Sequence, residues 1–160
     1  MVGSPDVTLD TTSRHIIELL QADGRMSYRA IAEEVGLSEA AARQRVQRLL
    51  AAGVMQIVAV TDPLEVGLHR QAMVGITVEG SIGEAADQLA ALDEVAYVVI
   101  AAGSFDLLVE VVCADDASLL ATLDERIRSL PTVRATETFM YLKLVKQTYA
   151  WGTRPPQPPA

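Results

Sequence analysis

The residues with the clearest potential for chemistry lie in a short stretch between Ser38 and Arg48. Arginine and glutamine can each form a pair of hydrogen bonds with the edge of a DNA base, and a small neighbour allows close approach. Such residues recur at helical spacing along one side of the stretch, namely Glu39, Ala40, Arg43, Gln44, Gln47 and Arg48. Arg45 lies beside this row and is a candidate phosphate contact. A plain solvated helix face has a similar composition, so the spacing alone leaves both interpretations open.

Two short helices between Ser27 and Gly53 would position this row. The hydroxyls of Ser27 and Ser38 can accept from the free backbone N–H groups where each helix starts, and both serines join the candidate DNA-binding residues. Gly36 supplies a position between the helices where a positive φ has little cost. Gly53 is a normal residue after a helix end. A short helix, a turn that contains glycine and a capped second helix together predict a helix-turn-helix.

The segment LSEAAARQRVQRLLAAGVMQ resembles the leucine-responsive/AsnC family of bacterial transcriptional regulators. The positions that carry the resemblance are Arg45, Val46, Arg48, Leu49, Gly53 and Val54. The similarity extends from about Leu9 to Val145, which is nearly the whole chain. The resemblance implies a DNA-binding regulator of transcription, and it favours that interpretation over the plain solvated face.

Charge is distributed unevenly along the chain. The 160 residues carry a formal net charge of −8, which by itself disfavours nucleic acid as a partner. Residues 1–56 hold six arginines against seven acids, whereas residues 57–160 hold seven basic against fourteen acidic residues. Between Ser38 and Arg48, three arginines stand against one glutamate, a local charge of +2. DNA binding would therefore depend on the paired helices of a dimer and should weaken steeply as salt rises.

Several classes of protein are disfavoured by what the sequence lacks. It shows no nucleophile and base in a recognisable motif, no Cys/His cluster and no Gly-rich phosphate loop, so we expect no enzyme activity, no metal and no cofactor. Cys113 is the single cysteine and is expected to be a buried strand residue. No stretch reaches the ~20 apolar residues of a membrane helix, and no signal peptide opens the chain. We therefore expect a cytoplasmic protein without a membrane partner.

The chain is predicted to form two domains with a linker between them. Its parts, in order, are a flexible tail over residues 1–8, a (winged) helix-turn-helix domain over 9–56, a linker strand over 57–70, a second domain over 71–146 and a flexible tail over 150–160. The first domain would begin with a helix over Leu9–Ala22. The strand-like run Val54–Val60 is broken at Pro63. The family resemblance implies that this strand pairs with its copy in a second subunit.

The second domain repeats one architecture. Strands are expected over Gln71–Glu79, Val95–Ala102, Asp106–Cys113 and Val133–Val145, and helices over Gly83–Leu92 and Ala117–Ser129. This doubled β-α-β unit predicts the ferredoxin-like βαββαβ fold of the α+β class, an antiparallel sheet with both helices on one face. Apolar residues on both faces of the third strand, such as Leu108 and Val109, suggest that a second subunit covers the open face. We therefore expect a homodimer or a higher even-numbered homo-oligomer.

The turn between the two middle strands, Ala102-Gly103-Ser104-Phe105-Asp106, is a candidate site for a small molecule. Gly103 can present backbone N–H groups to a carboxylate, and Asp106 can accept from an ammonium group, so together they suit an α-amino acid. The alternative is a hairpin turn in which Asp106 bonds its own backbone. The resemblance implies that this turn is the family's effector loop, in a pocket between subunits that a neighbour's Thr136 or Thr138 would line.

The sequence thus predicts a sequence-specific DNA-binding transcriptional regulator whose oligomeric state or DNA affinity responds to a small effector, with an amino acid favoured. One alternative is an enzyme on the same architecture, similar to tetrapyrrole decarboxylases. Such an enzyme is expected to need histidines around a porphyrin pocket, and His69 is the single histidine in the second half of the chain. Another is a DNA-binding protein without an effector. A third is a sensing module that has lost DNA binding, which the three arginines on one helix argue against.

Overall fold

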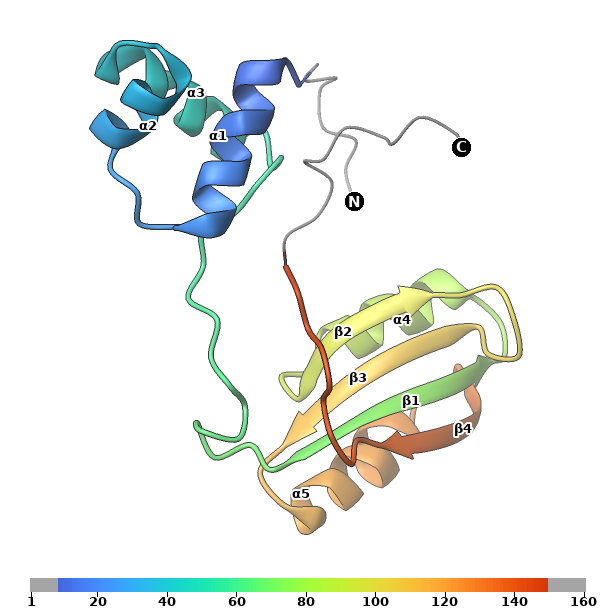
Figure 1. Cartoon of the computed structure of the whole chain (residues 1–160). Helices are drawn as coiled ribbons and strands as arrows, with labels where there is room; N and C mark the ends of the chain where they lie inside the picture. Colours follow the sequence, from blue (N-terminus) through green and yellow to red (C-terminus); the bar gives the residue numbers. More distant parts are fainter. Residues whose placement is uncertain (1–8, 150–160) are drawn as a thin grey trace, which may run out of the picture. The chain divides into compact units, whose positions relative to one another are not determined.

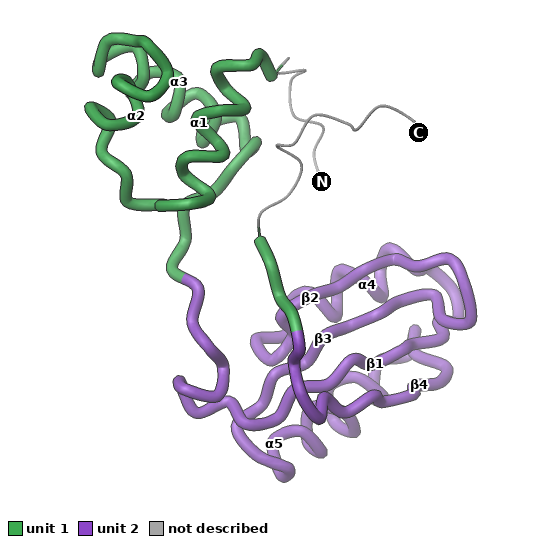
Figure 2. Tube along the Cα trace, viewed as in Figure 1, with its two compact units in different colours: residues 1–59, 146–160 green, residues 60–145 purple. Residues whose placement is uncertain are grey.

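A computed structural model describes residues 9–149 of the chain. The flexible tails predicted over residues 1–8 and 150–160 lie outside the described residues. The described part divides into two compact units (Figure 2). Residues up to Ala59 and those from Lys146 onward belong to the first unit, and Val60–Val145 form the second.

The first unit is helical over its described residues. Its helices are α1 (Thr11–Ala22), α2 (Tyr28–Val35) and α3 (Glu39–Ala51) (Figure 1). Each begins at a side-chain cap, in which Asp10, Ser27 or Ser38 accepts from the backbone N–H three residues further on. Gly36 has a φ of 67°, the left-handed conformation that ends α2 and turns the chain toward α3. The predicted helix-turn-helix is confirmed, with α1 starting at Thr11 rather than Leu9 because Asp10 is the cap.

A small apolar core holds these helices together. Ile16 of α1, Ile31 of α2 and Val46 of α3 are almost completely buried in one cluster. Burial of an aliphatic side chain of this size stabilises a fold by roughly 1.5–3 kcal/mol. Ala42 and Leu49 join Val46 on the buried side of α3. This packing fixes the rotation of α3 and leaves its opposite side in solvent.

The predicted strand over Val54–Val60 does not form in the single chain. Residues 55–60 have no regular secondary structure, and Ile57, Val58 and Val60 are each more than half exposed. A strand is stabilised by hydrogen bonds to a neighbouring strand, and the described part of the first unit offers none. For the same reason residues 9–69 contain no strand that would make a wing beside α1–α3.

The second unit contains an antiparallel sheet with helices packed on one face. The strand order is β2-β3-β1-β4, with β1 (Arg70–Val78), β2 (Val95–Ile100), β3 (Leu107–Cys113) and β4 (Val133–Met140) (Figure 1). The helices are α4 (Ile82–Ala90) and α5 (Asp116–Ala121), and a π-helical turn over Thr122–Ile127 continues α5. Element order and strand order confirm the predicted ferredoxin-like fold of the α+β class.

Alternation of side chains separates the two faces of the sheet. Buried residues of β1 and β3 share one cluster with Ala85 and Leu89 of α4 and Leu119 of α5, so both helices cover the same face. Residues opposite each other in neighbouring strands share a face, as Met73 and Glu110 do. We call the other side the open face, and its residues include Met73, Gly75, Tyr97, Leu108, Val112 and Phe139. No helix in the described part of the second unit covers this open face.

Two predicted strands end early because their partners end. β2 stops at Ile100 rather than Ala102, and β4 stops at Met140 rather than Val145. Met140 pairs with Ala72 and the Tyr141 N–H donates to the Gln71 carbonyl at 2.9 Å, so the residues that follow Tyr141 run past the start of β1.

The helix predicted over Ala117–Ser129 also changes character along its length. It becomes π-helical at Thr122, whose hydroxyl donates to the carbonyl of Ser118 at 2.8 Å. A side chain that bonds the preceding turn in this way competes with the regular helix hydrogen bonds, and π turns arise where that pattern is disturbed.

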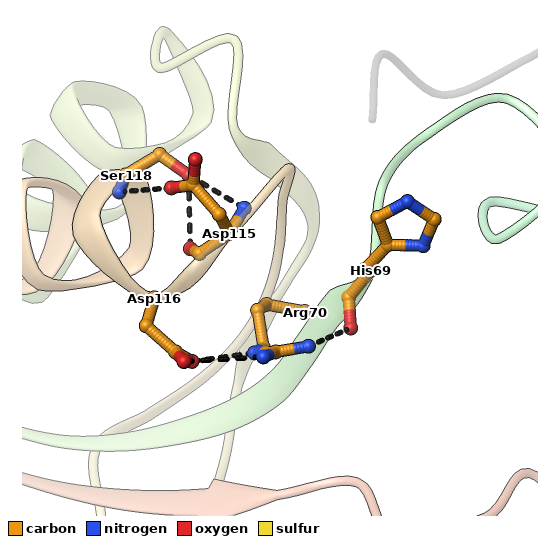
Figure 3. A network of polar contacts seen from close by, with 5 residues as sticks. All are labelled: His69, Arg70, Asp115, Asp116 and Ser118. Carbon is orange, nitrogen blue, oxygen red and sulfur yellow. Dashed lines mark hydrogen bonds and ion pairs between the residues drawn. The ribbon is translucent and has the colours of Figure 1, made fainter.

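A polar network fastens the end of the linker to the start of α5 (Figure 3). The Arg70 guanidinium donates to both carboxylate oxygens of Asp116, with 3.1 Å between Nη2 and Oδ2, and its Nη1 donates to the His69 carbonyl at 3.1 Å. Asp115 and Ser118 cap each other's backbone N–H groups. The bonds from Arg70 and Ser118 lower the pKa of Asp116 and of Asp115, respectively. In this network His69 contributes its backbone carbonyl.

Candidate nucleic-acid interface and effector loop

The outer side of α3 presents the whole predicted row of DNA-binding residues. Every member is exposed to solvent: Glu39, Ala40, Arg43, Gln44, Gln47 and Arg48. The hydroxyls of Ser27 and Ser38 are also at the surface, where each accepts from a helix N–H at 3.2 Å. These serines therefore position α2 and α3. The row itself is polar, locally cationic and free of apolar bulk, which suits the edges of bases.

Arg43 has two neighbours inside the unit. Its Nη2 lies 3.8 Å from a carboxylate oxygen of Glu39, one helical turn earlier. Its guanidinium carbon lies 5.0 Å from the centre of the Tyr28 ring, which belongs to α2. The Arg43 side chain remains 55% exposed, so these contacts orient it without removing it from solvent. Tyr28 was not among the residues singled out in the sequence, and its signal there is an aromatic side chain directly after a helix cap.

Arg45 lies beside the exposed row and contacts the start of α1. Its Nη1 donates to Oδ2 of Asp10 at 2.6 Å and to the Ser13 hydroxyl at 3.1 Å. Hydrogen bonds from Ser13, and then from Arg45, lower the pKa of Asp10 from 3.8 to about 2. Arg45 therefore joins α3 to the start of α1 by an ion pair, and its predicted phosphate contact stays a prediction.

The loop between β2 and β3 is fastened to β1 through Asp106. The backbone N–H of Asp106 donates to the Ile76 carbonyl at 2.9 Å, and its Oδ2 accepts from the N–H of Val78 at 2.8 Å. The Asp106 carbonyl accepts from the Ala101 N–H at 2.9 Å, which closes the turn. The carboxylate thus bonds a neighbouring strand, which corrects the alternative in which it bonds its own backbone. Only Oδ2 is used in this contact.

Phe105 of the same loop lies over the open face of the sheet. A Cβ added at Gly75 would come within 2.6 Å of the Phe105 ring, so the ring occupies space that only a glycine leaves free. The ring also meets Phe139 of β4 edge to face, with 6.1 Å between ring centres. By contrast Ala102, Gly103 and Ser104 are exposed, and a Cβ at Gly103 would meet nothing within 4 Å. The loop therefore has an anchored base and an open tip.

The two threonines predicted to line an effector pocket point to the other face of the sheet. Thr136 lies opposite Ile76 and Thr138 opposite Val74, and both of these β1 residues are buried beneath the helices. The Thr136 hydroxyl accepts from Nε of Arg128 at 3.0 Å. The register therefore separates Thr136 and Thr138 from the Phe105 side of the loop within one chain, and the structure does not bring them together with it.

Other kinds of site find no support in the described residues. Within residues 9–149, no group of three or more His, Cys, Asp and Glu side chains could hold a metal ion. Over the same residues, no helix has the length and apolar character to cross a membrane.

Two family models match the chain. Residues 9–50 match the AsnC-type helix-turn-helix domain, and residues 68–154 match a C-terminal dimeric alpha+beta barrel domain of AsnC-type regulators. The second match alone covers more than half of the chain. The chain therefore belongs to the leucine-responsive/AsnC family of transcriptional regulators, as its sequence predicts.

Relatives share this architecture over nearly their full length. An HTH-type transcriptional regulator of Pyrococcus abyssi is 33% identical over 149 residues, which cover 92% of this chain and 94% of the relative. The proline dehydrogenase transcriptional activator of Rhizobium radiobacter is 33% identical over 145 residues, covering 88% and 93%. A transcriptional regulator of Neisseria meningitidis, solved as a complex with L-methionine, is 26% identical with a TM-score of 0.81 and covers 91% and 97%.

The comparisons decide between a regulator and an enzyme. The matched relatives are named as transcriptional regulators, and the matched N-terminal domain is a DNA-binding helix-turn-helix. The chain is therefore a DNA-binding regulator of transcription, and the alternative of an enzyme on the same architecture is set aside.

Proposed function

We propose that this chain recognises specific DNA sequences as a dimer or a higher even-numbered assembly, and that a small effector, an amino acid, controls its affinity or its assembly. The observation that carries DNA recognition is the exposed row on α3, in which Ala40 is followed along the same side of the helix by two arginines and two glutamines. Two such helices in a dimer would enter successive major grooves about 34 Å apart.

Within this row we assign base recognition to the side chains that reach furthest. Arg43, Gln44, Gln47 and Arg48 can each form paired or charge-assisted hydrogen bonds with base edges or phosphates. Ala40 leaves room for a thymine methyl group. Glu39 carries the opposite charge and opposes phosphate contacts near the start of α3, so it favours selectivity over general affinity for DNA.

The assembly is proposed from surfaces that a single chain leaves unsatisfied. The open face carries the apolar side chains of Tyr97, Leu108, Val112 and Phe139 around Glu110, and apolar groups without cover suit an interaction surface. Ile57, Val58 and Val60, exposed in the run Val54–Val60, add a second surface, and the run would form the predicted strand by pairing with its copy. The matched domain family is described as dimeric, which supports the same assembly.

The effector is proposed to bind at the open tip of the loop. Gly103 and Ser104 can offer backbone N–H groups to a carboxylate, and the second oxygen of Asp106 can accept from an ammonium group. The relative that was solved with L-methionine supports an amino acid as the class of ligand. An effector-independent regulator is the second candidate, because the contact of Asp106 with Val78 also explains that carboxylate as part of the fold.

DNA recognition is tested by selecting duplexes from a randomised pool and then measuring Arg43→Ala on the enriched duplex. Loss of a base contact should cost about 1–3 kcal/mol on that duplex and much less on unrelated DNA. Arg29→Ala is the matched control, since Arg29 is an exposed arginine on α2 that pairs with Glu33. An equal loss on every sequence would reduce Arg43 to a phosphate contact.

Effector binding is tested by a thermal-shift screen of the twenty amino acids. A ligand at 100 times its Kd adds about 2.7 kcal/mol of apparent stability. Asp106→Asn is the sharpest variant, because its amide oxygen can still accept from Val78 N–H while the charge is gone. We expect the variant to keep the unliganded melting temperature and lose the ligand-induced shift. A shift retained in full would leave Asp106 with a structural role only.

A further inference from the structure

We propose that Tyr28 is a positioning residue for DNA recognition, which holds the Arg43 guanidinium ready for one base. This inference rests on the proposed base contact of Arg43 and adds a residue on another helix that governs it.

Tyr28 is itself held firmly. It is the first residue of α2, directly after the Ser27 cap, and its half-buried side chain packs against the apolar core of the helical unit. Arg43 lies in the middle of α3, whose buried side is fixed by Val46 and its neighbours. The ring on α2 and the guanidinium on α3 are therefore in contact, and the backbone of each helix is held by the core.

The two neighbours of Arg43 act in different ways. Glu39, 3.8 Å away, is a hydrogen-bond acceptor that competes with a base for the guanidinium N–H groups. The Tyr28 ring, 5.0 Å from the guanidinium carbon, attracts the positive charge through its π-electrons. That attraction does not consume one of the five N–H donors of arginine, so the donors remain available for a guanine edge. The ring can thus keep its contact while Arg43 binds a base.

Ordering the Arg43 side chain before DNA binds should increase the affinity for DNA. A flexible, exposed arginine loses rotamer freedom when it binds, and a contact that already restricts it reduces this loss. Removal of the ring should therefore weaken binding where Arg43 contacts the DNA and nowhere else. From the usual strength of an exposed cation–π contact, we expect about a two- to fivefold loss of affinity.

The test uses the full chain and the duplex that the wild-type protein enriches from a randomised pool. Affinities are measured for that duplex and for its single-base substitutions with Tyr28→Phe, Tyr28→Leu, Arg43→Ala and the double variant Tyr28→Leu/Arg43→Ala. Tyr28→Phe keeps the ring and should bind like the wild type. Tyr28→Leu should bind the enriched duplex more weakly than the wild type. It should also discriminate less between bases at the one base pair where Arg43→Ala no longer distinguishes the substituted duplexes. In the Arg43→Ala background, Tyr28→Leu should cause no further loss.

Three results would overturn the role of Tyr28 and leave the proposed DNA recognition intact. The first is a loss from Tyr28→Leu that persists in the Arg43→Ala background, which indicates a general structural role. The second is a loss from Tyr28→Phe equal to that from Tyr28→Leu, which indicates a phosphate contact by the hydroxyl. The third is full base discrimination in Tyr28→Leu. If thermal unfolding shows that Tyr28→Leu does not fold, Tyr28→Met fills similar space without a ring and replaces it in the cycle.

Failure of the proposed function gives a different result. A wild-type protein that enriches no sequence from the pool has no base contact for Tyr28 to position, and this would overturn the proposed recognition together with the inference.

Discussion

The helices α1–α3 bury their apolar sides within one chain, whereas the sheet unit leaves one of its faces without a covering helix. In α3 the apolar residues are buried and the polar row faces solvent. In β1 and β3 apolar residues occur on both faces, and helices cover only one of them. The difference supports the proposal that one chain can form the DNA-binding surface while a second copy covers the sheet.

The same contrast appears in how the candidate sites are anchored. The candidate DNA-binding side chains have neighbours within the helical unit, as Arg43 has in Tyr28 and Glu39. The effector loop is instead fastened to a neighbouring strand by Asp106 and Phe105. A change in β1 can therefore reach the loop between β2 and β3 directly through these contacts.

The largest effect should follow from a charge on the open face. Leu108→Asp would place a carboxylate in the proposed subunit interface, where an uncompensated buried charge costs about 3–5 kcal/mol. We expect dimer affinity to fall by more than about 100-fold and the protein to sediment as a monomer, while the helical unit keeps its melting temperature.

Leu120→Asp is the matched control for this charge, because Leu120 is 64% exposed on α5, away from the open face. It should leave the assembly intact. If Leu108→Asp also remains a dimer, the open face is not the subunit interface and the contrast between the two units fails.

An intermediate effect should follow from Gly75→Ala. The new methyl group would overlap the Phe105 ring, and overpacking of this kind costs about 1–3 kcal/mol. Thermal unfolding should show a lower melting temperature for the sheet unit alone. Phe105→Ala in the same chain should recover part of the loss, because it vacates the space. A double variant no more stable than Gly75→Ala would show that the strain lies elsewhere.

The smallest effect concerns the acid stability of the helical unit. Asp10 has its pKa lowered from 3.8 to about 2, so its charge stabilises the folded state above pH 3.8 and this contribution is lost as the pH falls through 2. Asp10→Asn keeps a good helix cap but removes the charge. Helical circular dichroism during thermal unfolding should show a weaker dependence on pH between 2 and 4 in the variant. Identical pH dependence would rule out a stabilising role for the Asp10 charge.

Features set by neighbouring residues could be predicted from the sequence. Ser27 and Ser38 are caps because each needs only the backbone three residues ahead. Gly36 ends α2 for an equally local reason, the left-handed φ. The exposed row on α3 follows from helical periodicity alone, which is why every member of the row lies on the predicted side.

Features set by distant residues could not be predicted in this way. The partner of Arg45 is Asp10, which lies 35 positions earlier, and the sequence around Arg45 does not predict this contact. The faces of Thr136 and Thr138 depend on the register between β4 and β1, since a shift of one residue would reverse both. The missing strand over Val54–Val60 depends on a pairing partner that one chain does not supply.

The Gly75–Phe105 contact also has a consequence for how such sequences diverge. A descendant that acquires a side chain at position 75 gains a clash unless position 105 shrinks, and a descendant that shrinks position 105 first leaves a cavity beside Phe139. Each single step is disfavoured while the joint step is tolerated. The two positions should therefore be inherited as a pair.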